Sequence, residues 1–163
     1  MTSIRRTGSD DPEFKSLVAQ LDAMLSEVNG TDDGFYRQFN HIETLPHVVV
    51  AVASGAPVGC GALRALDSAT VELKRMYVVP SARGNGVGAA IVTELEDIAT
   101  SLGFTRIVLE TCKVLAAANR LYAKCGFVRT ANYGPYVGVT RSLCYEKILG
   151  TPYGAQLNPS DRP

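Results

Sequence analysis

The stretch "RGNGVGAA", residues 83–90, places an arginine ahead of closely spaced glycines near the middle of the chain. Glycines let backbone N–H groups approach an anion, and a helix that follows directs the positive end of its dipole at the same point. The stretch therefore predicts a pyrophosphate loop, of which two kinds fit. Gly84, Gly86 and Ala89 match a dinucleotide fingerprint, whereas Arg83, Gly86 and Gly88 match a different motif. The alternative is a turn that only connects a strand to a helix and binds no phosphate.

Length and charge limit the domain organisation and the partners. The chain has 163 residues, which suits one domain over residues 1–149, and the Gly-, Pro- and polar-rich tail at 150–163 is predicted to be mobile. Sixteen basic residues balance sixteen acidic ones, so we expect neither a nucleic acid nor a membrane as partner. Phosphate binding must then be a local property.

The cysteines and the N-terminal segment bear on the cellular compartment. Cys60, Cys112, Cys125 and Cys144 show neither C-x-x-C nor zinc-ligand spacing, so we expect reduced thiols and no metal site. The segment "MTSIRRTGSDD" has no apolar signal region, and the longest apolar run, "VVVAVA", is too short to span a bilayer. A cytoplasmic protein is expected.

Hydrophobic periodicity predicts a mixed α/β layout on one sheet. Asp11 and Pro12 suit the start of a helix that Asn29 and Gly30 end, and a shorter helix is expected near 33–39. Three antiparallel strands are expected at 47–53, 58–66 and 70–79, followed by a helix at 87–102. The remaining expected elements are a strand at 104–112, a helix at 115–124, and strands at 126–131 and 142–149.

The surroundings of the glycine loop argue against a dinucleotide. One feature supports a dinucleotide site: Glu110 lies near the end of the next predicted strand, at about the sequence distance where an acid would hold a ribose hydroxyl. Against it, "PSAR" separates the loop from its strand, that strand carries charges, and too little chain remains for a second βαβαβ half.

Two runs of sequence resemble the GNAT superfamily of acetyl-CoA-dependent N-acetyltransferases. They are "VELKRMYVVPSARGNGVGAAIVTELE" at 71–96 with "LETC" at 109–112, and "AANRLYAKCGF" at 117–127. Arg83, Gly86 and Gly88 meet the family's loop signature. Asn119, a Leu-Tyr pair and a Gly-Phe pair meet its later signature, in the correct order and spacing.

The resemblance implies a fold and a cofactor. The fold is an α/β (mixed α+β) domain whose twisted mixed sheet of about six or seven strands is flanked by helices and splayed at the cofactor site. Acetyl-CoA would be the co-substrate, with no covalent enzyme intermediate. The implied cofactor-binding residues are Met76, Tyr77, Val78, Arg83, Gly84, Asn85, Gly86, Val87, Gly88, Ala89 and Asn119.

Three residues are candidates for the proton transfers that the reaction needs. Tyr122 matches the family position of a general acid for the departing thiolate, although it also suits core packing on its helix. Glu72 shares a strand face with Met76 and Val78 if the alternation is regular, and carboxylates on this strand are bases in some family members. A solvated carboxylate paired with a neighbouring cation is the alternative, and Glu110 is a further candidate base.

The acceptor is expected to be a small-molecule amine, or an amine of a protein. Phe35, Tyr133 and Tyr136 are candidates for enclosing it, with Arg129 or Arg141 for a carboxylate, although the "YGPY" turn also suits a rigid surface hairpin. A non-catalytic acyl-CoA-binding domain is the alternative function. A homodimer is expected by analogy with the family.

Overall fold

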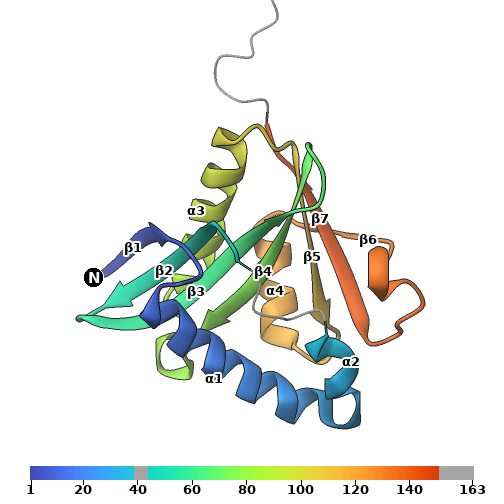
Figure 1. Cartoon of the computed structure of the whole chain (residues 1–163), viewed down its shortest axis with the longest axis horizontal. Helices are drawn as coiled ribbons and strands as arrows, with labels where there is room; N and C mark the ends of the chain where they lie inside the picture. The colour runs from blue at the N-terminus through green and yellow to red at the C-terminus, as the bar shows by residue number, and fades with distance from the viewer. Residues whose placement is uncertain (39–43, 151–163) are drawn as a thin grey trace, which may run out of the picture. The chain divides into compact units, whose positions relative to one another are not determined.

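The computed structural model describes residues 1–38 and 44–150, and the chain divides into two compact units. The first comprises Met1–Arg64 with Leu73–Leu95, and the second comprises Ala65–Glu72 with the residues from Glu96 onward. Strand β4 contributes residues to both units. The sheet has seven strands in the order β1-β2-β3-β4-β5-β7-β6 (Figure 1).

Most of the elements lie where periodicity predicts them. The strands are β1 (Thr2–Thr7), β2 (His47–Ala53), β3 (Ala56–Ala65), β4 (Thr70–Val78), β5 (Arg106–Cys112), β6 (Val128–Thr130) and β7 (Ser142–Ile148). The α-helices are α1 (Pro12–Asn29), α2 (Asp33–Arg37), α3 (Val87–Ser101) and α4 (Ala116–Lys124). Short 3-10 turns, η1 to η3, cover Gly30–Asp32, Pro80–Ala82 and Gly134–Tyr136.

The first unit is a layer of antiparallel strands with a helix on each face. Side chains from α1 pack with those of β2, β3 and β4 in a core of Phe14, Leu17, Leu21, Leu45, Val48, Val50, Cys60, Ala62 and Tyr77. The opposite face lies against α3, where a Cβ added at Gly59 would stand 2.8 Å from Cδ1 of Ile91. Glycine at this position is what lets α3 approach the strand closely.

Strand β1 is the element that the sequence analysis missed. It pairs antiparallel with β2 from Thr2↔Ala53 to Thr7↔Val48, at the edge of the sheet. Alternate side chains point to opposite faces, so Arg5 reaches α1 while Arg6 bonds Glu94 of α3 at 2.5 Å. A short segment with Ile4 as its one large apolar residue gives little period-two signal.

The second unit is built on β5, β7 and β6. β7 pairs antiparallel with β5 over Arg106–Cys112 and with β6 over Val128–Thr130. The parallel ladder between β4 and β5 joins Thr70, Val71 and Glu72 to Arg106, Ile107 and Val108. Paired residues share a sheet face, so Glu72 lies on the same face as Val108.

The predicted fold class is confirmed: the fold is mixed α/β, with a mixed sheet of seven strands and flanking helices. The expected splay of the sheet at the cofactor site stays a prediction, as does the single domain over 1–149. The predicted mobile tail lies outside the described residues from 151 onward. Among the described residues, no helix has the length and apolar character needed to cross a membrane.

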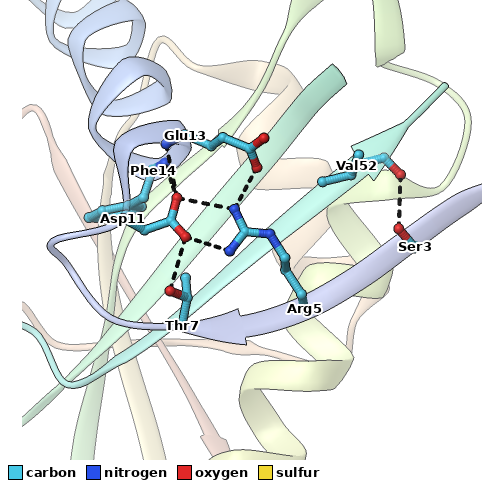
Figure 2. Close-up of polar contacts among 7 residues, drawn as sticks. All are labelled: Ser3, Arg5, Thr7, Asp11, Glu13, Phe14 and Val52. Atoms are coloured by element: carbon cyan, nitrogen blue, oxygen red, sulfur yellow. Dashed lines mark hydrogen bonds and ion pairs between the residues drawn. The ribbon is translucent and has the colours of Figure 1, made fainter. Parts of the chain in front are cut away.

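A charged cluster fixes the start of α1 (Figure 2). The carboxylate of Asp11 accepts hydrogen bonds from the backbone N–H groups of Glu13 and Phe14, at 2.9 and 3.2 Å, and one from the Thr7 hydroxyl at 3.0 Å. The guanidinium of Arg5 bonds both carboxylate oxygens of Asp11 and also bonds Glu13. Asp11 therefore ties β1 to the first turn of α1.

The Asp11→Asn variant is expected to unfold more easily by about 1–3 kcal/mol, because it loses the charge-assisted bonds to Arg5. The bond from Arg5 holds the pKa of Asp11 well below its usual range. A depressed carboxyl pKa stabilises the fold above the unfolded-state value of about 4, and the contribution disappears as the pH falls further. Urea unfolding at pH 7 and pH 3 should show the variant losing less stability on acidification than the wild type.

Asp10→Asn is the matched control, since Asp10 is an exposed carboxylate next to Asp11 in the sequence. Its unfolding free energy at pH 7 should stay within about 0.5 kcal/mol of the wild type. Equal losses for the two variants would show that the cluster does not stabilise the helix start.

Candidate active site

The glycine loop leads from β4 into α3 in the first unit. Gly84 and Gly86 both have φ of +80°, in the left-handed region that favours glycine, and both are exposed. α3 begins at Val87, and the first N–H groups of a helix lack acceptors within it. The loop thus presents backbone donors together with the positive end of a helix dipole, the arrangement that binds an anion.

Arg83 is exposed and anchored at one end of its guanidinium. Its Nε donates to the carbonyl oxygen of Val78 at 2.9 Å, and the guanidinium carbon lies 5.8 Å from the centre of the Tyr77 ring. These contacts place a fixed positive charge beside the loop, as a pyrophosphate site requires.

An irregularity in β4 interrupts its alternation. Arg75 has φ of +57°, which costs a non-glycine residue about 1–3 kcal/mol. The Cys60 thiol donates to the Arg75 carbonyl oxygen at 3.3 Å, and the buried guanidinium bonds Asp22 of α1 at 2.8 Å. The regular alternation that predicted one shared face for Glu72, Met76 and Val78 is therefore broken at Arg75.

Glu72 is a buried carboxylate of the second unit, with 5 % of its surface exposed. The hydroxyl of Tyr133 donates to its Oε2 at 2.5 Å. Burial, and then the charge of Glu72, raise the pKa of Tyr133, so the phenol keeps its proton and remains a donor. The charge on Glu72 is thus held by a neutral donor from the β6–β7 loop.

Asn119 on α4 makes three hydrogen bonds within the second unit. Its Nδ2 donates to the carbonyl oxygens of Cys112 and Leu115, at 3.1 and 2.8 Å, and its Oδ1 accepts from the Tyr145 hydroxyl at 2.8 Å. The amide fixes the β5–α4 junction. Its predicted contact with the cofactor would need the second lone pair of Oδ1, or the exchange of one of these bonds.

Tyr122 packs inside the second unit. Its ring centre lies 6.0 Å from that of Phe127 and 6.1 Å from that of Tyr145. Burial is the main cause that raises the pKa of Tyr122, and the charge of Glu110 adds to it. The phenol therefore stays protonated at neutral pH, as a proton donor must.

Glu72 and Tyr122 lie on opposite faces of the second unit's strands. Val108, on the face of Glu72, pairs with Glu146 of β7, and the neighbouring residue Tyr145 therefore points to the other face. The ring of Tyr122 packs against Tyr145. The register thus places Glu72 and the ring that packs against Tyr122 on opposite faces of these strands.

The predicted site residues are divided between the two units. Glu72, Asn119, Tyr122, Tyr133 and Tyr136 belong to the second unit, where Tyr136 is buried and meets the Tyr133 ring edge-on at 5.8 Å. The first unit holds Phe35, Met76, Tyr77, Val78, Arg83, Gly84, Asn85, Gly86, Val87, Gly88 and Ala89. Phe35 is 37 % exposed on α2 and packs edge-on against Tyr36.

From the sequence we expect no metal site. Within 1–38 and 44–150, no three His, Cys, Asp or Glu side chains gather where they could hold a metal ion. The expectation that the site needs no metal stays a prediction.

Sequence reasoning missed the residues that support the site. The sequence around Arg75 does not predict its positive φ, because the residues that bond Arg75, Cys60 and Asp22, come from distant segments. Asn132 donates through Nδ2 to the carbonyl oxygens of Tyr136, Val139 and Ser142, each at 3.1 Å. An asparagine ahead of a Gly-Pro turn was the available signal for this contact.

The chain is similar in sequence to known acetyltransferases. The sequence model of the Acetyltransferase (GNAT) family matches residues 15–127. A protein of Azospirillum brasilense named IAA acetyltransferase is 36% identical over 142 residues, 82% of this chain and 88% of the relative. N-acetylaspartate synthetase of Homo sapiens is 38% identical over 107 residues, 64% of this chain and 35% of that protein.

Solved structures agree with the sequence relatives. A candidate acyl-CoA N-acyltransferase from Klebsiella pneumoniae has a TM-score of 0.77 at 28% identity, covering 92% of this chain and 99% of that one. A GNAT family acetyltransferase from Elizabethkingia anophelis with acetyl-CoA bound has a TM-score of 0.65, covering 91% of this chain and 98% of that one. At 16% identity the latter is a likeness of fold alone.

The thiols of this chain are expected to be unreactive in the folded protein. Burial raises the pKa of Cys60 to about 12, and it also raises the pKa values of Cys125 and Cys144. Iodoacetamide at pH 8 should therefore leave Cys60 unmodified, with Cys125 the most accessible of the three, whereas protein in urea should be alkylated throughout. Peptide mass spectrometry measures this, and rapid alkylation of native Cys60 would show that burial does not suppress the reactivity of this thiol.

Proposed function

The chain belongs to the acetyltransferase (GNAT) family, and on that basis we propose that it moves the acetyl group of acetyl-CoA directly to the amine of a small molecule. It is an N-acetyltransferase with acetyl-CoA as its co-substrate. The proposal adds the direct transfer in a ternary complex and the class of acceptor.

The presence of a buried carboxylate, Glu72, and a phenol that keeps its proton, Tyr122, carries the proposal. The amine nitrogen attacks the thioester carbon, a C–N bond forms, and the C–S bond then breaks. One proton leaves the nitrogen and one is taken up by the departing thiolate. Because the first proton is lost at nitrogen and the second is gained at sulfur, the reaction uses one base and one acid.

Each candidate has a defined part in this reaction. Glu72, as a carboxylate held by Tyr133, accepts the proton from the amine, directly or through water. Tyr122 donates toward the thiolate. The raised pKa of Tyr122 lies above the value of about 8.5 for an ordinary thiol, so the phenol acts chiefly as a hydrogen-bond donor while negative charge builds on sulfur.

Acetyl-CoA is proposed to lie along β4 and the glycine loop. Backbone groups of Met76, Tyr77 and Val78 would pair with the pantetheine arm. Asn119 of the second unit is a further candidate contact of the cofactor. The loop amides from Arg83 through Ala89 would hold the pyrophosphate. A backbone N–H near Val78 would serve as the oxyanion donor.

The acceptor is proposed to be a small molecule, with Tyr133 and Tyr136 of the second unit and Phe35 of the first as candidate contacts. The IAA acetyltransferase and N-acetylaspartate synthetase relatives are both named for small molecules, which supports this class over a protein amine. We also propose a single domain over 1–149, a homodimer and a cytoplasmic location.

A domain that binds acyl-CoA without chemistry is the second candidate. The ring packing of Tyr122 and the three hydrogen bonds of Asn119 are contacts that a binding domain would also keep for stability. Release of free CoA from acetyl-CoA in the presence of an amine panel separates the two functions, because only an enzyme turns over.

Acetyl-CoA, and not NAD or NADP, is expected to stabilise the protein. At a hundredfold excess over its Kd, a ligand adds about 2.7 kcal/mol, and this raises the Tm of a domain this size by roughly 5–10 °C. The Gly86→Ala variant should bind acetyl-CoA roughly tenfold more weakly, because alanine resists the φ of +80° that orients the loop amides. Thermal melts and calorimetry measure the two effects.

Gly103→Ala is the matched control, since Gly103 has φ of +89° and follows α3 at its other end. It should lose a similar amount of stability and keep its affinity for acetyl-CoA. A Tm shift with NAD and none with acetyl-CoA would contradict the proposed cofactor site.

Tyr122→Phe is expected to lower kcat roughly a hundredfold, because the variant keeps the buried ring and loses only the donor to the thiolate. The Tm and the Kd for acetyl-CoA should change little. Steady-state release of free CoA, followed with a thiol reagent, measures kcat. Unchanged turnover would remove Tyr122 as the acid and leave the family assignment intact.

A further inference from the structure

We propose that Tyr133 is a positioning residue for Glu72: its phenol hydroxyl aims the Glu72 carboxylate, and the β6–β7 loop thereby controls the base of the reaction. The inference rests on the proposed function, in which Glu72 is that base. It assigns Tyr133 a role different from lining the acceptor pocket.

The contact between the two side chains carries the inference. The Tyr133 hydroxyl lies 2.5 Å from Oε2 of Glu72, in the range of charge-assisted O–H···O bonds. Glu72 is 5 % exposed, and losing a donor to a buried carboxylate is costly, so the bond contributes to holding the carboxylate in place. The phenol has one hydroxyl proton and donates it in the hydrogen bond to the carboxylate, so Tyr133 is the donor and Glu72 the acceptor.

The loop that carries Tyr133 is itself held rigidly. The side-chain amide of Asn132 bonds the carbonyl oxygens of Tyr136, Val139 and Ser142, each at 3.1 Å. Backbone bonds from Tyr136 N to Tyr133 O and from Val139 N to Tyr136 O, both 3.0 Å, close the turns between them. Tyr133 also meets the buried Tyr136 ring edge-on. The phenol is therefore fixed before any acceptor binds.

A fixed phenol matters because a glutamate side chain has three rotatable bonds. Without this donor, the carboxylate would spend more of its time turned away from the amine, and the rate would fall accordingly. The Tyr133 hydroxyl, unlike the ring, acts on the reaction through Glu72, so the effect of removing the hydroxyl should vanish when Glu72 cannot act as a base.

A double-variant cycle tests this dependence. Glu72→Gln should lower kcat by roughly a hundredfold or more, and Tyr133→Phe by roughly tenfold. In the Glu72→Gln background, Tyr133→Phe should cause no further loss, and KM for acetyl-CoA should not change. A role in loop packing would instead lower kcat by the same factor in both backgrounds, and that result would overturn the inference.

Glu146→Gln is the matched control, because Glu146 is a carboxylate of the same sheet face that pairs with Arg106 at 2.6 Å. Its kcat should equal that of the wild type, and Tyr133→Phe should lower kcat tenfold in this background too. Loss of the Tyr133 effect in the Glu146→Gln background would also overturn the inference, since the dependence would not be specific to Glu72.

Urea unfolding of the same variants gives a readout besides activity. The double variant of Glu72 and Tyr133 should be less destabilised than the sum of the single variants, because the contact can be lost only once. Additive effects would overturn the inference whatever the kinetics. Wild-type protein that releases no CoA with any amine would overturn the proposed function itself, which distinguishes the two failures.

Discussion

The second unit depends on the need of a buried carboxylate for a hydrogen-bond donor. Glu72 enters the interior on a strand and meets the Tyr133 hydroxyl there. The loop before β7, which carries that hydroxyl, is held by the amide of Asn132. The phenol keeps its proton because burial and the neighbouring charge both oppose ionisation of Tyr133.

The elements that could be predicted are those with local signals. Asp11 and Gly30 mark the two ends of α1, and Val87 and Gly103 bracket α3, because capping is a property of a few consecutive residues. The edge strand β1 was missed because its identity comes from pairing with β2. The contact between Glu72 and Tyr133 joins residues far apart in sequence, and no periodicity reports it.

The motif residues of α4 have structural duties beside their predicted chemical ones. The amide of Asn119 holds the β5–α4 junction, and the ring of Tyr122 fills space against Phe127 and Tyr145. A match to the family signature therefore does not show whether Asn119 and Tyr122 serve packing or catalysis. The hydroxyl of Tyr122 is the part of the motif with no packing duty on these rings, so it is where a chemical role is best sought.

The left-handed backbone at Arg75 couples the evolution of three separate segments. The conformation is unfavourable for arginine, and the Cys60 thiol on β3 and Asp22 on α1 both bond this residue. A change at any one of the three positions alters the selective value of the other two. We therefore expect epistasis among Cys60, Asp22 and Arg75. Homologues that differ at one of these three positions should differ at the others as well.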